Sequence, residues 1–260
     1  TVMKRVVFNQ KGGVGKTSIS CNLAAISAQQ GYKTLLIDLD TQCNSSEYLL
    51  GANYAEKSIT AVDFFKTFLG VFGRKPYLPN FCHPTHFKNL SVMAASPELT
   101  NIERELESRH KIYKFRDALN EAEKHYDRIY IDTPPALNFY SMTALIAADS
   151  LLIPFDCDSF SRQALYNLVS TVAEIREDHN EGLKIEGVVV NQFNPQAKFP
   201  QELVDQLIAD GLPVLDTYLN TSIKVKESRE GHEPLVHFAP GHKATQQFIN
   251  LYQKLESIEA

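Results

Sequence analysis

Five apolar runs recur along the chain, and each is nearly continuous instead of alternating with polar residues. Such runs are typical of strands that are buried on both faces of a parallel sheet. They cover residues 4–9, 33–38, 127–132, 150–155 and 184–191. Apolar positions recur with helical spacing over about 16–30, 96–126 and 162–178. Strand and helix in alternation predict an α/β fold with a doubly wound, mostly parallel sheet and helices on both of its faces.

The least regular part of the chain is residues 70–89, which we expect to form a surface excursion. The sequence has no internal repeat, low-complexity tract or linker-like segment. We therefore expect residues 1–260 to form one domain, a size that a single large α/β domain can reach.

Composition narrows the class of protein. Hydrophobic residues make up 43% and charged residues 22%, as in globular proteins with a sizeable core. No stretch resembles a transmembrane helix or a secretory signal. The cysteines have no C-x-x-C pair, which argues against a disulfide scaffold, a zinc site or a shared cluster and favours the cytoplasm. These are Cys21, Cys43, Cys82 and Cys157. Because the net charge is −5, any contact with nucleic acid needs a local basic patch.

A glycine-rich stretch, NQKGGVGKTS at residues 9–18, lies between the first predicted strand and the first predicted helix. This context is that of a phosphate-binding loop, in which backbone amides and a helix N-terminus face the phosphates. Lys16 is expected to reach the β- and γ-phosphates, and the Thr17 hydroxyl to bind Mg²⁺. Two features are unusual, because Gln10 replaces the first glycine of the common pattern and Lys11 adds a second lysine. The further nucleotide-binding candidates are Gly12, Gly13, Val14, Gly15 and Ser18.

Carboxylates follow two of the predicted strands. Asp132 ends one strand, Asp38 ends another, and Asp40 lies two residues further along. Because the carboxyl ends of parallel strands line the ligand crevice, Asp132 is expected to hold Mg²⁺ through water and Asp38 to support the metal. Each acid taken singly could also cap a helix or a turn.

Five segments together resemble the ParA/MinD family of deviant Walker A ATPases. They are KGGVGKTS (11–18), LLIDLDTQCNSSEYLLG (35–51), IYIDTPPALNFYSMTALIAAD (129–149), VVVNQF (188–193) and SIKVKESREGHEPLVHFAPGHKATQQF (222–248). The resemblance covers nearly the whole chain, in the order of the family's motifs. It is greatest to the short ParA/Soj-like partitioning and positioning ATPases.

This resemblance implies a slow, Mg²⁺-dependent ATPase that forms a homodimer around ATP. The family's signature lysine corresponds to Lys11, which would reach the phosphates held by the partner subunit and stabilise their charge as an arginine finger does. By the same resemblance, Asp40 positions the attacking water and Asn191 contacts the adenine. From sequence alone, Asn191 could equally cap the end of its strand.

The end of the chain bears on the surface that such a dimer would bind. Residues 244–260 have Phe248, Leu251, Tyr252 and Leu255 on one face, while acidic residues on the other would be repelled by an anionic membrane. We expect this helix to dock on the core and not on a membrane.

By resemblance, members that bind the nucleoid contact DNA without sequence preference, and Lys224 stands where the family carries a DNA-binding arginine. Non-specific binding requires only the neutralisation of phosphates. The candidate DNA contacts are Lys224, Lys226, Arg229, Lys198 and Lys243. The alternative is a solvated loop in a protein that docks on a polar or cargo protein without binding DNA. Both DNA binding and docking on a protein imply a ParB-like or cargo adaptor that stimulates hydrolysis. DNA binding, called the DNA output below, also implies association with a bacterial nucleoid.

Overall fold

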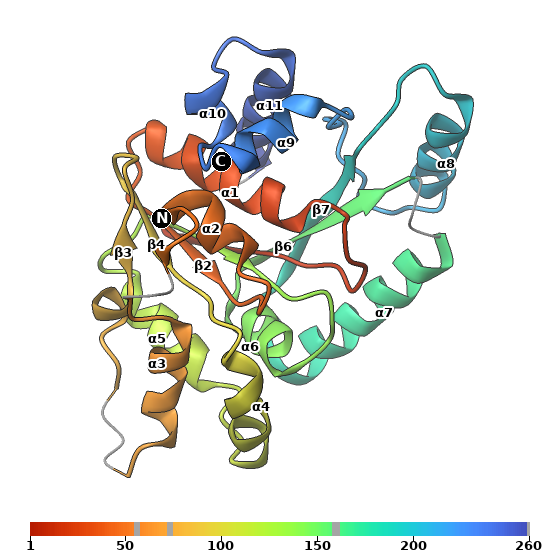
Figure 1. Ribbon diagram of the computed structural model, residues 1–260. Helices are drawn as coiled ribbons and strands as arrows, with labels where there is room; N and C mark the ends of the chain where they lie inside the picture. The colour runs from red at the N-terminus through yellow and green to blue at the C-terminus, as the bar shows by residue number, and fades with distance from the viewer. Residues whose placement is uncertain (55–57, 72–74, 158–161, 259–260) are drawn as a thin grey trace.

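The computed structural model describes residues 1–54, 58–71, 75–157 and 162–258 (Figure 1). Within these residues the strands form one seven-stranded sheet in the order β3-β4-β2-β5-β1-β6-β7. All neighbouring strands are parallel except β3 and β4. The strands are β1 (Met3–Val7), β2 (Thr34–Asp38), β3 (His83–Pro84), β4 (Leu90–Met93), β5 (Arg128–Asp132), β6 (Ser150–Asp156) and β7 (Lys184–Asn191). The predicted doubly wound, mostly parallel sheet is confirmed.

Helices cover both faces of the sheet, because alternate strand residues point to opposite sides. Val6 and Val7 of β1, for example, belong to two different apolar cores. One core packs under α1 (Lys16–Gln29), α2 (Asn44–Leu50), α10 (Leu235–Phe238) and α11 (Lys243–Ile258), with α9 (Ile223–Glu230) beside them. The other packs under α3 (Ala61–Lys66), α4 (Leu99–Ser108), α5 (Lys114–Ala122), α6 (Phe139–Ala147), α7 (Arg162–His179) and α8 (Lys198–Ala209). In Figure 1 the first group lies above the sheet and α3–α6 lie below it.

Two elements differ from the sequence pattern. The helical spacing over 96–126 is divided into α4 and α5, because His110 adopts a left-handed conformation with a φ of 55°. The strand β4 was not predicted, since its four residues are too few to give a clear pattern. Part of the expected excursion, residues 75–89, contains a short 3₁₀ helix (Leu78–Phe81) and the edge strand β3.

The C-terminal helix α11 docks on the core as predicted. The side chains of Phe248, Leu251, Tyr252 and Leu255 are all buried, in the same core as α1. None of the helices described by the structure has the length and apolar character needed to cross a bilayer.

A buried ion pair connects the strand before the glycine loop with the last strand of the sheet. Arg5 on β1 is fully buried and donates from Nε and Nη2 to the two carboxylate oxygens of Glu186 on β7, at 2.8 and 3.0 Å. Its Nη1 also donates to the Tyr130 hydroxyl at 3.1 Å. The pair reaches across β6, and it therefore fixes β1 and β7 relative to each other.

Candidate nucleotide-binding site

The glycine loop curls around the N-terminus of α1. Gly13 and Gly15 have φ values of 74° and 95°, which only glycine adopts readily. Gly15 occupies the N-cap position and so offers no side-chain oxygen, and the first turn of α1 has no acidic residue. The positive end of this helix therefore has no anion of its own and is suited to bind a phosphate.

Lys16 lies inside this loop. Its side chain is buried, and Nζ donates to the Lys11 carbonyl at 3.0 Å. Burial lowers the pKa of Lys16, while the charges of Asp132 and Asp40 act in the opposite direction. An amine held in this way is placed to exchange a neutral carbonyl for a phosphate oxygen.

Lys11 has a different setting from Lys16. It is exposed, and its side chain makes no hydrogen bond or ion pair with any residue that the structure describes. Its backbone amide donates to Asn9 Oδ1 at 2.9 Å, so the main chain is fixed while the ammonium group is free.

Asp132, at the end of β5, has the strongest features of a metal ligand. Its Oδ2 accepts from Thr17 Oγ1 at 3.0 Å and from Ser45 Oγ at 2.6 Å. Its Oδ1 is buried and has no hydrogen-bond partner in the described part of the chain. Burial, with a contribution from the charge of Asp40, raises the pKa of Asp132 to about 6. A buried carboxylate oxygen without a partner is costly unless a cation or water satisfies it, and Mg²⁺ prefers such oxygens.

Asp38 and Asp40 have the polar contacts of loop-forming residues. Asp38 is fully buried, and its oxygens accept from the Asp40 amide at 3.0 Å and from the amide and hydroxyl of Ser46 at 2.9 and 2.7 Å. Burial, then the charge of Asp132, raises its pKa to about 8. Both Asp38 oxygens are thus engaged in holding the turn from β2 into α2. Asp40 Oδ1 accepts from the Gln42 amide at 3.0 Å, and burial raises the Asp40 pKa.

The opposite side of the loop is contacted by the end of β7. Asn191 Nδ2 donates to the Val14 carbonyl at 3.1 Å, and Gln192 Nε2 donates to the Gly13 carbonyl at 3.4 Å. A Cβ added at Gly15 would lie 2.0 Å from Asn191 Nδ2. Gly15 is therefore required by its φ value and also by the close approach of Asn191.

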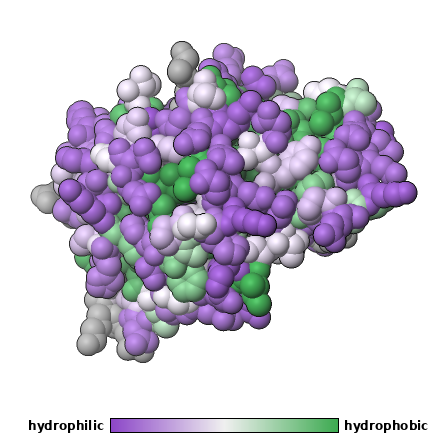
Figure 2. Space-filling model, turned by 90° about the horizontal axis from the view of Figure 1, so that it is seen from above, coloured by the Kyte–Doolittle hydropathy of each residue, from purple (hydrophilic) through white to green (hydrophobic). Residues whose placement is uncertain are grey.

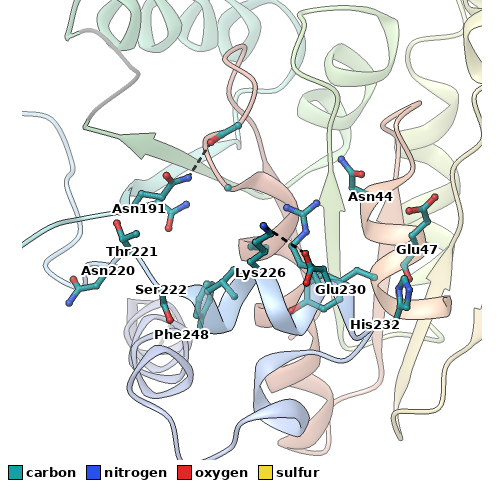
Figure 3. A pocket seen from close by; sticks show the side chains of 17 residues that line it. Asn44, Glu47, Asn191, Asn220, Thr221, Ser222, Lys226, Glu230, His232 and Phe248 are labelled. Carbon is teal, nitrogen blue, oxygen red and sulfur yellow. Dashed lines mark hydrogen bonds and ion pairs between the residues drawn. The ribbon is translucent and has the colours of Figure 1, made fainter. Parts of the chain in front are cut away.

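A cavity of about 620 Å³ opens from this contact and extends along α9 toward α2 (Figure 3). Figure 3 shows Asn191 reaching toward the glycine loop on one side, and Lys226, Glu230 and His232 on the other. The lining residues come from the loop and α1 (Gly13, Gly15, Ser18), from α2 (Asn44, Glu47, Tyr48), from the end of β7 (Asn191, Gln192), from the segment before and within α9 (Asn220, Thr221, Ser222, Val225, Lys226, Arg229, Glu230), and from His232 and Phe248.

The candidate DNA contacts do not form one cluster. Lys224 and Lys226 lie on α9 and pair with Glu227 at 2.8 Å and with Glu230 at 3.9 Å. Arg229 is on the same helix, and Lys226 and Arg229 line the cavity. The exposed residues Lys198 and Lys243 begin two other helices, α8 and α11. The face seen in Figure 2, from the side of α9–α11, is largely hydrophilic with small apolar patches.

Several polar residues of the site were not found from the sequence. The hydroxyl of Ser45 donates to Asp132, and the hydroxyl of Ser46 donates to Asp38. In the sequence, only their position shortly after Asp40 indicated that they could belong to the site. Tyr48 of α2 is buried and hydrogen bonds to Ser228 of α9, while Asn22 of α1 donates to the Tyr48 hydroxyl at 3.2 Å. The hydrogen bond between Tyr48 and Ser228 joins residues that are 180 positions apart in the sequence, so no local pattern could predict it.

The fold and the site together define a P-loop nucleotide-binding protein. A family model described as an AAA domain matches residues 3–185. The chain is 30% identical over 251 residues to the chromosome partitioning protein ParA of Myxococcus xanthus, covering 96% of this chain and 86% of that protein. It is 33% identical over 229 residues to the chromosome-partitioning ATPase Soj of Treponema pallidum, covering 86% of each. The chain belongs to the ParA/MinD family of deviant Walker A ATPases.

Solved structures share the fold over the full length of the chain. Apo McdA of Cyanothece superposes with a TM-score of 0.85 at 19% identity, covering 100% of both chains. The septum site-determining protein MinD of Pyrococcus horikoshii, in complex with Mg-ADP, superposes with a TM-score of 0.78 at 21% identity and covers 100% of this chain and 98% of its own.

Proposed function

We propose that this protein is a slow, Mg²⁺-dependent ATPase that forms a homodimer around ATP, binds DNA without sequence preference, and is released on hydrolysis to segregate or position a cargo. The observation that carries the proposal is Lys11, an exposed lysine without a partner among the described residues, beside an otherwise complete phosphate site. Because no described group of its own subunit binds it, this second cation is available to the phosphates of another subunit.

Within one subunit, Lys16 and the amides of the glycine loop hold the phosphates, and Asp40 orients the attacking water. Thr17 and Asp132 hold Mg²⁺, with Asp38 supporting the loop next to them. Oδ1 of Asp132 is buried and has no partner in the described part of the chain, so it can bind this ion. The Thr17 hydroxyl, which donates to Oδ2 of the same carboxylate, lies close enough to bind the ion as well. When bound, Mg²⁺ neutralises negative charge on the phosphate oxygens. Asn191 contacts the adenine after leaving the Val14 carbonyl that it binds in this structure.

The proposed output rests on the relatives named for chromosome partitioning and on the cations of α9. In a dimer, Lys224 and Lys226 would be doubled, and Lys198 and Lys243 could add further phosphate contacts. An adaptor, ParB-like or attached to the cargo, would stimulate hydrolysis. The protein would then be found on the nucleoid while it is bound to ATP.

One observation favours a second candidate function. Both Lys224 and Lys226 form ion pairs with glutamates of their own helix, which reduces the charge available to DNA. A positioning ATPase that docks on a polar or cargo protein, without binding DNA, would need no larger basic patch.

DNA binding in defined nucleotide states separates the two functions. Purified protein is mixed with random-sequence duplex DNA in ADP, ATP and a non-hydrolysable ATP analogue, over a salt series, and its oligomeric state is measured in each sample. Lys224→Ala tests the DNA contact, Lys11→Ala tests the dimer, and Lys66→Ala on the opposite face of the sheet is the matched control. The DNA output predicts binding only by the ATP-state dimer, with a salt slope lower by about 1 for each phosphate contact removed.

The other results each have a clear meaning. A dimer that forms with ATP but does not bind DNA would reject the DNA output and favour the protein-docking function. A protein that stays monomeric in every nucleotide state would reject the ATP-dependent dimer.

A further inference from the structure

The side chain of Arg229 differs from the other cations of α9. It is half-buried and lines the cavity, yet it makes no hydrogen bond or ion pair with any residue in the described part of the chain. Lys224 and Lys226, by contrast, each have a glutamate partner on the same helix. A partly buried cation without a counter-charge is unfavourable unless a ligand supplies one.

The surroundings of Arg229 indicate where its charge acts. Burial raises the pKa values of Cys21 and Tyr48, and the positive charge of Arg229 acts in the opposite direction on both. The guanidinium therefore lies close enough to α1 and α2 to act on their inner residues. The same cavity is lined by Ser18, in the first turn of α1, and by Asn44, at the start of α2. The cavity therefore runs from the phosphate-binding end of α1 past Arg229.

The acidic residues of the cavity do not neutralise Arg229. Glu230 pairs with Lys226, and Glu47 is exposed and forms no hydrogen bond or ion pair with the guanidinium. The remaining lining groups near Asn191 are amides, hydroxyls and apolar side chains such as Val225 and Phe248, which suit a base and a sugar.

We propose that Arg229 is a direct ligand of the bound nucleotide, contacting a phosphate group from α9, and that it is not a DNA contact. A guanidinium has a planar arrangement of donors that matches phosphate oxygens in a bidentate manner. This inference rests on the nucleotide-binding part of the proposed function and is independent of the DNA output. It places α9 in contact with the nucleotide, so occupation of the site orders the helix that carries Lys224 and Lys226.

The test is calorimetric titration of the full-length protein with ADP in Mg²⁺, and with adenosine as a ligand that lacks phosphate. Arg229→Ala is expected to weaken ADP binding about 10-fold, the loss of one charge-assisted contact, and to leave adenosine binding unchanged. Arg229→Lys should retain part of the affinity, because it keeps the charge but loses the fork. Arg104→Ala, an exposed arginine on α4, is the matched control and should bind ADP as the wild type does.

The unfolding midpoint of each variant shows whether it has kept its fold. An ADP affinity of Arg229→Ala within twofold of the wild type, together with weaker DNA binding, would overturn the inference and return Arg229 to the DNA surface. Failure of the wild-type protein to bind ADP at all would instead overturn the nucleotide site, and the proposed function with it.

Discussion

The two ends of the nucleotide cavity are built in different ways. At the phosphate end, one contiguous loop and the ends of two strands bring together Lys16, Thr17 and Asp132. Thr17 donates a hydrogen bond to Asp132, and Lys16 donates one to the Lys11 carbonyl of the same loop. At the base end, residues from β7, from 220–222 and from α9 line a wide space, and Asn191 and Gln192 are the side chains that hydrogen bond to the glycine loop.

The difference suggests that the phosphate end determines the chemical reaction, while the base end determines which nucleotide is preferred. Phosphate chemistry is common to many nucleotides and needs a fixed geometry, which a short rigid loop supplies. The base end has polar groups on longer segments, where substitution is less costly to the fold. We therefore expect changes at the phosphate end to abolish activity, and changes at the base end to alter affinity and preference.

The largest expected effect comes from removing the ion pair between β1, which leads into the phosphate end, and β7, which ends at the base end. Glu186→Ala removes the carboxylate that accepts two hydrogen bonds from the buried Arg5 guanidinium, and should lower the free energy of unfolding by about 3–5 kcal/mol. Chemical denaturation measures this change. The exposed pair Arg116–Asp117 provides the control, since Asp117→Ala should cost less than about 1 kcal/mol. Equal costs would mean that the buried pair does not fix β1 to β7.

Removing the phosphate-end lysine comes next. Lys16→Ala should reduce ATP hydrolysis by about 10²–10³-fold, because a charge that stabilises the transferred phosphate is lost from a water-poor site. Phosphate release under ATP saturation measures the rate. Asn191→Ala, tested beside it, should keep most of its rate once ATP saturates. A comparable loss in both variants would contradict the division between the two ends.

The acids of the phosphate end predict a pH dependence in the absence of metal. The folded-state pKa of Asp132, about 6, is above that of an unfolded aspartate, so the folded state binds the proton more tightly. The contribution of Asp132 to stability should be greatest near pH 4 and should be lost as the pH rises through about 6, by on the order of 2 kcal/mol.

Thermal unfolding in EDTA across this range measures the effect. Asp132→Asn should flatten the profile and unfold at a higher temperature than the wild type at pH 8, while Mg²⁺ should stabilise only the wild type. A wild-type midpoint that rises between pH 4 and pH 8 in EDTA would contradict this assignment.

The smallest expected effect is at the base end. Asn191→Ala should weaken ADP binding about fivefold, the value of one hydrogen bond, and reduce the preference for adenine over guanine. Competition between ADP and GDP measures both. A variant with unchanged preference would show that Asn191 only supports the glycine loop.

More residues of the phosphate end than of the base end could be predicted from the sequence, because the phosphate end is built from local motifs. Lys16 and Thr17 belong to one local motif, and Asp132 ends a strand with a clear apolar run. The edge strand β4 and the division at His110 were missed, because neither has a strong local pattern. At the base end, the residues that line the cavity are brought together by tertiary packing, so it could not be predicted that Arg229 and Ser18 line the same cavity.

The buried contact between Tyr48 and Ser228 has a consequence for how the molecule opens. Asn22 donates to the Tyr48 hydroxyl, Tyr48 hydrogen bonds to Ser228, and Ser228 in turn donates to the Glu233 carbonyl, all with little access to water. Separating α2 from α9 would leave these groups unsatisfied, at about 1–3 kcal/mol for each. Amide hydrogens of the two helices should therefore exchange with solvent as one cooperative unit.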